Sequence, residues 1–333
     1  MILQEQSFTD QLLHTPDLLP TLTLVFAAIL GLLVGSFSNV LIYRMPRYCM
    51  SIVSPPSHCP KCETPIQWYD NLPVISWALL LRGRCRKCKV KIPIRYPLVE
   101  IIVGVVFLLL AREVLVRPWE AHERLTVGGD YFLFLFWATG AVMLFVGAWI
   151  DAQMQIIPDR ISLGGAAFAL LAAPFVPQLH QWAVPTRLVS DALFFASVEP
   201  MWLRAWLTSA ALMGIAAAGL WAFGLLGYLV APAAAKEAGG GMGMGDVKII
   251  AFMAGLLGWP KLLVAFGVAI GLGAIVGFPK LYRKWLGKPV DSMIAFGPFL
   301  CIGAIVAILF ARPIFDWVIQ YLEVTRLISP VRN

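Results

Sequence analysis

The sequence contains few charged residues, because only 14% of its 333 residues are Asp, Glu, Lys or Arg. Soluble globular proteins contain about 25% charged residues. Hydrophobic residues make up 59% of the chain, so the shortage of charge excludes a single water-soluble core. The composition instead predicts an all-α polytopic membrane protein.

Basic residues are also missing from the first twenty positions, which contain no Lys or Arg. A cleavable secretory signal has a basic segment ahead of its apolar stretch, so we expect the first apolar run to be retained as a helix with its N-terminus outside. No G-x₄-G-K-[S/T] string occurs, which excludes a P-loop. The net charge of +7 is concentrated in two loops, 44–95 and 280–288. Clustering of positive charge in loops between apolar runs indicates how a protein is oriented in the membrane. We therefore expect contacts with membrane lipids and no nucleic-acid partner.

A spanning helix needs about 20 apolar residues. The sequence contains seven apolar runs of about this length and one shorter run, Val247–Trp259. The shorter run would cover about 20 Å of a hydrocarbon core about 30 Å thick. About eight transmembrane helices are therefore predicted, and with the N-terminus outside they place both basic loops in the cytosol. The seven longer runs are Thr21–Tyr43, Pro97–Val116, Tyr131–Ile150, Ile156–Val176, Arg204–Val230, Lys261–Phe278 and Ala295–Tyr321.

Four of the six cysteines form two C-x₂-C pairs separated by 22 residues, Cys59 with Cys62 and Cys85 with Cys88. This spacing is typical of a structural Zn²⁺ site with four thiolate ligands and no open position for water. Disulfides are the rival interpretation, but cytosolic thiols stay reduced. Residues 44–96 are thus predicted to be a small cytosolic zinc-binding domain between the first two spans.

Two acidic residues lie at the ends of apolar runs, where charge is costly. Asp151 closes the third run, and Asp246 opens the short one directly after Gly243 and Gly245. An ionisable residue in a membrane segment is a functional-site hypothesis by default. Two carboxyl groups that share a proton can hydrolyse an amide, with one activating water and the other polarising the carbonyl.

Structural roles for these acids remain open at this stage. Asp246 is also a good helix N-cap, and Asp151 would equally suit an interfacial position. Lys248 is near enough in sequence to neutralise Asp246, although residues two apart leave different sides of a helix. Asp159 follows a proline at a predicted helix start, so we interpret it as a capping residue and as the second choice for the partner of Asp246.

Together these motifs resemble those of type IV prepilin peptidases, which are bifunctional leader peptidases and N-methyltransferases of the GxGD aspartic protease class. The resemblance covers most of the chain. The matching segments are GSFSNVLIYRMPR (35–47), the cysteine tetrad, DNLPVISWALLLRGRCRKC (70–88), RYPLVE (95–100), Asp151 seven residues before PDR, and GMGDVK (243–248).

The resemblance implies an enzyme of the bacterial inner membrane with its active site facing the cytosol. It would cut the basic leader from type IV prepilins or type II secretion pseudopilins after a glycine, and then methylate the new N-terminus with S-adenosylmethionine. Asp151 and Asp246 would be the catalytic acids. Residues 1–43 would hold the external N-terminus and first helix, 44–96 the methyltransferase-associated zinc domain, and 97–333 the peptidase core. The segment around Gly83 is where we expect the methyl donor, with Gly243, Gly245 and Lys248 supporting the acids.

Two alternatives remain. A presenilin-like intramembrane protease would use the same chemistry, but there the first aspartate normally follows tyrosine, whereas Ile150 precedes Asp151 here. A zinc-ribbon membrane scaffold or transporter would use the acids only to cap helices.

Overall fold

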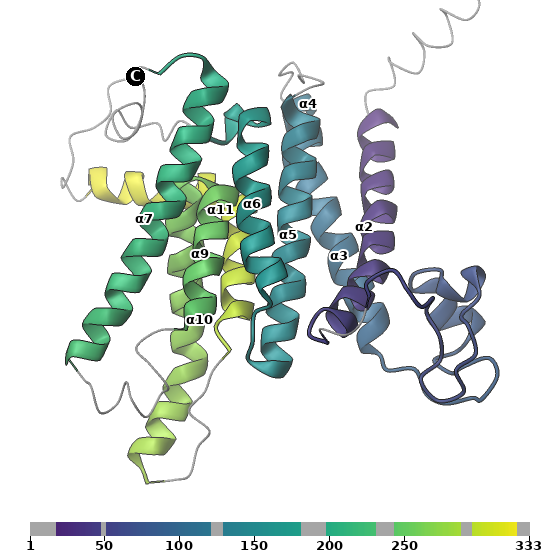
Figure 1. Ribbon diagram of the computed structural model, residues 1–333. Helices are drawn as coiled ribbons and strands as arrows, with labels where there is room; N and C mark the ends of the chain where they lie inside the picture. The colour runs from purple at the N-terminus through teal and green to yellow at the C-terminus, as the bar shows by residue number, and fades with distance from the viewer. Residues whose placement is uncertain are drawn as a thin grey trace, which may run out of the picture. The chain divides into compact units, whose positions relative to one another are not determined.

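The computed structural model describes residues 18–47, 51–120, 129–180, 198–230, 243–287 and 295–324. In these residues the regular secondary structure is helical, and isolated β-bridges occur in place of strands. It divides into two compact units, residues 1–134 and 135–333, whose elements are labelled in Figure 1. The predicted external N-terminus, Cys49 and most of the 231–246 loop lie outside the described residues.

The first unit is built on a pair of packed helices, α2 (Leu18–Arg44) and α3 (Arg95–Ala111). The end of α3 continues through a π-helical turn, η3 (Arg112–Val116), into α4 (Arg117–Glu120). The predicted run Pro97–Val116 therefore coincides with one continuous helical segment.

Glycines allow α2 and α3 to approach closely. A Cβ atom at Gly31 would lie 2.7 Å from Cβ of Phe107, and one at Gly35 would lie 2.7 Å from Cα of Glu100. The two glycines are four residues apart and so share one face of α2, a spacing that recurs where membrane helices pack backbone to backbone.

The chain between α2 and α3 carries the cysteines and two short helical turns, η1 (Trp68–Asn71) and η2 (Ser76–Leu80). Polar side chains of the helix pair hold this domain. A carboxylate oxygen of Glu100 accepts a hydrogen bond of 2.7 Å from the backbone N–H of Val74. The guanidinium group of Arg44 donates to three backbone carbonyl oxygens, those of Ser51, Ile52 and Pro55.

The second unit contains the remaining helices. Its elements are α5 (Gly129–Met154, from Leu135 onward), α6 (Asp159–Ala172), η4 (Ala173–Phe175), η5 (Pro177–His180), α7 (Met201–Val230), α9 (Met244–Leu257), α10 (Trp259–Trp285) and α11 (Gly297–Val324).

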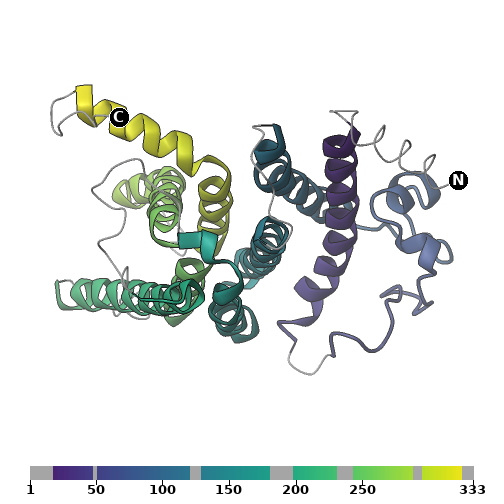
Figure 2. The ribbon, with the colours of Figure 1, turned by 90° about the horizontal axis from the view of Figure 1, so that it is seen from above.

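The short helix α9 lies at the centre of this unit. It packs against α6, α7, α10 and α11, which are seen from above in Figure 2, and nine of its 14 residues are buried. Small residues allow this packing: a Cβ atom at Gly165 would lie 2.6 Å from Cδ1 of Phe252, and one at Gly255 would lie 2.8 Å from Sδ of Met213. Helix α9 can be shorter than the hydrocarbon core is thick, because it is surrounded by protein rather than by lipid.

The C-terminal end of α9 is fixed by an aromatic side chain of α5. The indole N–H of Trp137 donates a hydrogen bond of 3.1 Å to the carbonyl oxygen of Leu256. The ammonium group of Lys261, which is fully buried in the first turn of α10, lies 4.8 Å from the centre of the Trp137 ring. A cation over an aromatic face is attracted to it, so this contact holds α10 to α5.

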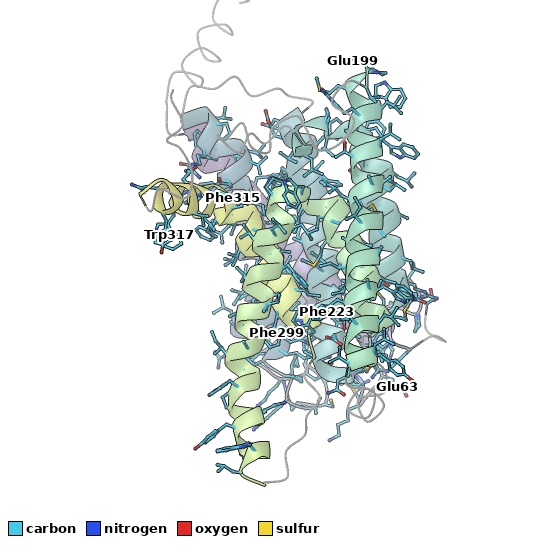
Figure 3. All side chains as sticks on the ribbon, turned by 90° about the vertical axis from the view of Figure 1, so that its left-hand side faces the viewer. Glu63, Glu199, Phe223, Phe299, Phe315 and Trp317 are labelled. Carbon is cyan, nitrogen blue, oxygen red and sulfur yellow. The ribbon has the colours of Figure 1, made fainter. Side chains whose placement is uncertain are left out.

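Each predicted apolar run coincides with a helix, but two of the boundaries were wrong. Residues 156–158 precede α6, because Pro158 has an extended backbone and is the N-cap of the helix. The helix ends at Ala172, and Pro174 lies in the 3₁₀ turn that follows. The predicted run Ala295–Tyr321 is bent, because Pro313 lies inside α11. Figure 3 labels Phe315 and Trp317 on the arm of α11 that follows the bend.

Four described helices are long and apolar enough to cross a membrane. These are α2, α5, α7 and the Trp259–Lys280 portion of α10, and Gly297–Ala311 of α11 is a shorter apolar helix. Length and composition therefore indicate a multi-pass membrane protein.

Candidate active site and metal centre

Asp151 lies in the last turn of α5 and is buried. One of its carboxylate oxygens, Oδ2, accepts a hydrogen bond of 2.9 Å from the backbone N–H of Gly297. Gly297 is the first residue of α11, and a Cβ atom there would lie 2.7 Å from the same oxygen. The carboxyl group thus packs directly against the backbone of a glycine at the start of another helix.

Asp246 is the third residue of α9, and Gly243 is the N-cap of that helix. The interpretation of Asp246 as the N-cap is therefore wrong. Its side chain folds back toward the cap, since a Cβ atom at Gly243 would lie 3.2 Å from Oδ2 of Asp246. Gly245 has more room, because its nearest neighbour would be Cβ of Ile157 at 3.6 Å.

The two acids predicted to act together lie at one end of the second unit. Asp151 lies in the last turn of α5, and Asp246 lies in the first turn of α9. The direct pairing of these two carboxyl groups from distant parts of the chain stays a prediction. Such a pair can divide the roles of general base and general acid in an amide hydrolysis.

Lys248 has a different partner from the one considered in the sequence. Its ammonium nitrogen lies 2.6 Å from Oδ1 of Asp159, in the first turn of α6. The N-cap of α6 is Pro158, without a side-chain cap, so the interpretation of Asp159 as a capping residue is wrong. The Asp159 carboxylate therefore forms an ion pair with Lys248.

Sequence reasoning missed Gly297. The available signal was the string FGPF at 296–299, because glycine followed by proline is typical of a helix start. That pattern predicts where α11 begins, but it does not indicate which side chain the helix start contacts.

The cysteines form two turns of the same design in the first unit. In the first turn, the N–H of Cys59 donates to Thr64 O at 3.0 Å, and the N–H of Glu63 donates to Cys59 O at 2.9 Å. The second turn repeats both bonds, from Cys85 to Val90 and from Lys89 to Cys85. The residue after each second cysteine, Glu63 or Lys89, has a positive φ, and an isolated β-bridge flanks each turn.

The four sulfur atoms converge on one point. All lie within 4.8 Å of one another, with Cys59 Sγ 3.7 Å from Cys88 Sγ and Cys62 Sγ 3.9 Å from Cys85 Sγ. A tetrahedral zinc with bonds of about 2.3 Å requires sulfur–sulfur separations of about 3.8 Å. The donor set and its spacing therefore fit a zinc ion, and none of the four cysteines is in a disulfide.

Hydrogen bonds prepare two of these thiols for metal binding. Hydrogen bonds with the side chain and backbone of Thr64 lower the pKa of Cys62 to about 6. Hydrogen bonds from the backbone of Cys88 and Lys87 lower the pKa of Cys85. The thiolate is the form that binds a metal, so these bonds favour the ligand state.

Gly83, expected near the methyl donor, has a structural explanation. It has a φ of +68°, and a Cβ atom there would lie 3.3 Å from Cζ2 of Trp77. Its N–H donates to Trp77 O, and its carbonyl oxygen accepts from Ile92 N, both at 2.8 Å. The turn of the zinc domain thus requires glycine at this position, and a methyl-donor site near Gly83 stays a prediction.

Two family models match the chain. The bacterial peptidase A24 N-terminal domain matches residues 29–114, and the type IV leader peptidase family matches residues 138–278. These matches fall within the first and second units, respectively.

Among curated proteins, the similar sequences are named prepilin leader peptidase/N-methyltransferase. The Legionella pneumophila protein is 28% identical over 91% of this chain and 96% of its own length. The Aeromonas salmonicida protein is 30% identical over 90% and 94%, and the Pseudomonas putida protein is 32% identical over 89% and 93%. No solved structure matches the chain significantly.

Proposed function

The chain belongs to the type IV leader peptidase family, and on that basis we propose that it removes the leader of type IV prepilins or pseudopilins and N-methylates the new N-terminus. The observation that carries the proposal is that the two predicted catalytic acids, Asp151 and Asp246, end α5 and begin α9 in the same unit, with Gly297 N–H holding the first. Membership of the family indicates the substrate class, and the acids supply the chemistry.

We propose that the two carboxyl groups hold one proton between them. The ionised group takes a proton from a water molecule, which attacks the scissile carbonyl, while the protonated group donates a hydrogen bond to the carbonyl oxygen. Collapse of the tetrahedral intermediate transfers a proton to the departing amine and breaks the C–N bond. The pair returns to its starting state without a covalent intermediate or a metal ion.

The proposed topology has eight crossings in the bacterial inner membrane, with the N-terminus outside and the acids facing the cytosol. It is supported by the basic loops at 44–95 and 280–288, which favour the cytosolic side. Four helices meet the length and hydropathy requirements for a span, and α9 is short but enclosed by protein. The substrate's own apolar helix would dock laterally among the spans.

Zinc has a structural role in this proposal. Cys59, Cys62, Cys85 and Cys88 would fill its four positions, so the metal would fold the domain rather than activate water. S-adenosylmethionine would supply an electrophilic methyl group to the α-amino group that cleavage releases. The zinc domain remains the proposed methyltransferase-associated part of the chain.

The scaffold or transporter alternative is disfavoured, because it needs acids that only cap helices. Asp246 is not an N-cap, and the chain matches the type IV leader peptidase family. The presenilin-like alternative shares the chemistry but not the family matches.

The test is cleavage of a purified prepilin by the purified protein in lipid, followed by mass spectrometry with and without S-adenosylmethionine. Asp151→Asn and Asp246→Asn should each lower kcat by about 10²- to 10⁴-fold, the range of general acid–base catalysis. The exposed Asp316→Asn is the matched control that should retain cleavage. Normal processing by either of the first two variants would refute the aspartic protease mechanism.

A further inference from the structure

Gly297 contacts a predicted catalytic acid through its backbone alone. Its N–H lies 2.9 Å from Oδ2 of Asp151, a residue 146 positions earlier in the chain. Asp151 is buried, so this hydrogen bond is shielded from competing water. The contact joins the last turn of α5 to the first residue of α11, which lies two residues before the Phe299 labelled in Figure 3.

The position requires glycine for steric reasons. A Cβ atom at position 297 would lie 2.7 Å from Oδ2, 3.2 Å from Cγ and 3.2 Å from Cβ of Asp151. Real Cβ atoms essentially never approach a neighbour as closely as the first of these distances. Any side chain at this position would therefore displace the carboxylate or the start of the helix.

The N–H of Gly297 is available because it belongs to the first turn of α11. The first N–H groups of a helix have no acceptor within the helix, so a carboxylate can take this one without breaking a helical bond. The next residue, Pro298, has no N–H to offer. The positive end of the helix dipole also favours a carboxylate at this place.

The start of α11 is held by the rest of the second unit. Helix α11 packs extensively against α10, where Gly303 allows its backbone to contact the backbone of Ala265. The N–H groups of Phe299 and Leu300 donate to Phe296 O at 3.1 and 3.2 Å and close the first turn. The donor at Gly297 is therefore fixed in position rather than carried on a free loop.

We propose that Gly297 is a positioning residue of the peptidase site, whose backbone N–H fixes Oδ2 of Asp151 so that the other carboxylate oxygen faces water and substrate. The inference rests on the proposed function and adds the first turn of α11 to the two acid-bearing helices. A misplacement of about 1 Å at a reacting group can cost about 100-fold in rate.

The test is Gly297→Ala, which keeps the N–H and adds only the Cβ atom. We expect kcat for prepilin cleavage to fall about 100-fold, with KM within about twofold of wild type, because the apolar docking of substrate is unchanged. Gly271→Ala on α10 is the matched control, since a Cβ atom there meets nothing within 4 Å. N-methylation of a pilin whose leader has already been removed should remain, which separates loss of position from loss of fold.

Gly297→Ala could lose activity because the protein is less stable. A double-mutant cycle on the thermal unfolding midpoint tests whether that loss of stability comes from the contact with Asp151. If the added Cβ acts through the Asp151 carboxylate, Asp151→Ala should restore much of the lost unfolding midpoint in the double variant. Additive midpoints would overturn the inference, and so would a normal kcat in Gly297→Ala. A parallel loss of cleavage and methylation would also overturn it, because that pattern indicates a purely structural glycine.

The failure of this inference is distinguishable from the failure of the proposed function. If Asp151→Asn abolishes cleavage while Gly297→Ala does not affect it, the positioning role is wrong and the protease mechanism stands. If Asp151→Asn cleaves normally, the protease mechanism itself is wrong.

Discussion

The ammonium nitrogen of Lys248 lies 2.6 Å from a carboxylate oxygen of Asp159, so an ion pair joins the first turn of α9 to the first turn of α6. Asp246 lies two residues before Lys248, on the same helical turn. The pair therefore fixes the segment that presents Asp246.

We expect the loss of this pair to reduce activity without removing it. The Lys248 side chain is partly exposed and that of Asp159 largely exposed, so Lys248→Gln should lower the free energy of unfolding by less than about 1 kcal/mol. The kcat for prepilin cleavage should fall moderately, because the start of α9 loses a fixed contact. The charge-exchanged double variant Lys248→Asp/Asp159→Lys should recover part of the loss. No recovery would show that the pair does not position α9.

The two glycines before Asp246 should differ in their tolerance of a side chain. A Cβ atom at Gly243 would crowd Oδ2 of Asp246 at 3.2 Å, whereas one at Gly245 would have an ordinary contact with Ile157 at 3.6 Å. Gly243→Ala should therefore lower kcat more than Gly245→Ala, as measured with the same prepilin.

Alanine is also a poor N-cap, so helix stability needs its own control. Gly243→Ser restores a favoured capping residue while keeping the added Cβ atom. If crowding of Asp246 is the cause, Gly243→Ser should be as stable as wild type but remain impaired in cleavage. Equal kcat for Gly243→Ala and Gly245→Ala would contradict this account.

The parts of the site that depend on short-range sequence were predictable. A C-x₂-C pair specifies a tight turn, and the repeat of that pattern predicted that Cys59 and Cys85 would begin equivalent turns. The hydropathy runs predicted the helices, because burial in lipid or protein requires continuous apolar sequence. The pairing of the acids was predicted from topology, since Asp151 ends one helix and Asp246 begins another in the same unit.

Contacts made by backbone or over long sequence separation were not predictable. The bond from Gly297 to Asp151 leaves no trace in residue type beyond a glycine, and it depends on where α11 packs. The bend in α11 is caused by Pro313, which is visible in the sequence, but a hydropathy run does not show that a proline inside it bends the helix. The ion pair of Lys248 with Asp159 required knowing that α6 and α9 lie side by side.

Zinc binding is predicted to depend on the tetrad and to support methylation more than cleavage. Cys59→Ser should remove the metal, measured by elemental analysis of the purified protein, because three thiolates leave the tetrahedron incomplete. The acids lie in the other unit, so cleavage should fall less than N-methylation. Cys301→Ser is the control, since this buried cysteine is outside the cluster. Unchanged metal content in Cys59→Ser would refute the tetrad.

The link between Glu100 and Val74 should hold the zinc domain on its helix pair. Glu100 is buried on α3, and its carboxylate accepts the Val74 N–H at 2.7 Å. Val74 has a φ of +59°, an unfavourable value for a β-branched residue, so its conformation needs such a partner. Glu100→Ala would leave the N–H without its acceptor, a loss of about 1–3 kcal/mol if the group stays buried.

Hydrogen exchange measures this effect locally. We expect Glu100→Ala to speed amide exchange at 72–80, and Glu100→Gln to do so less, because an amide oxygen still accepts the bond. Glu113→Ala is the matched control, since Glu113 forms an ion pair with Arg117, one helical turn away. Exchange that is equally slow in Glu100→Ala and wild type would show that the carboxylate does not hold the loop. Faster exchange throughout α2 and α3 would instead indicate that Glu100 stabilises the helix pair itself.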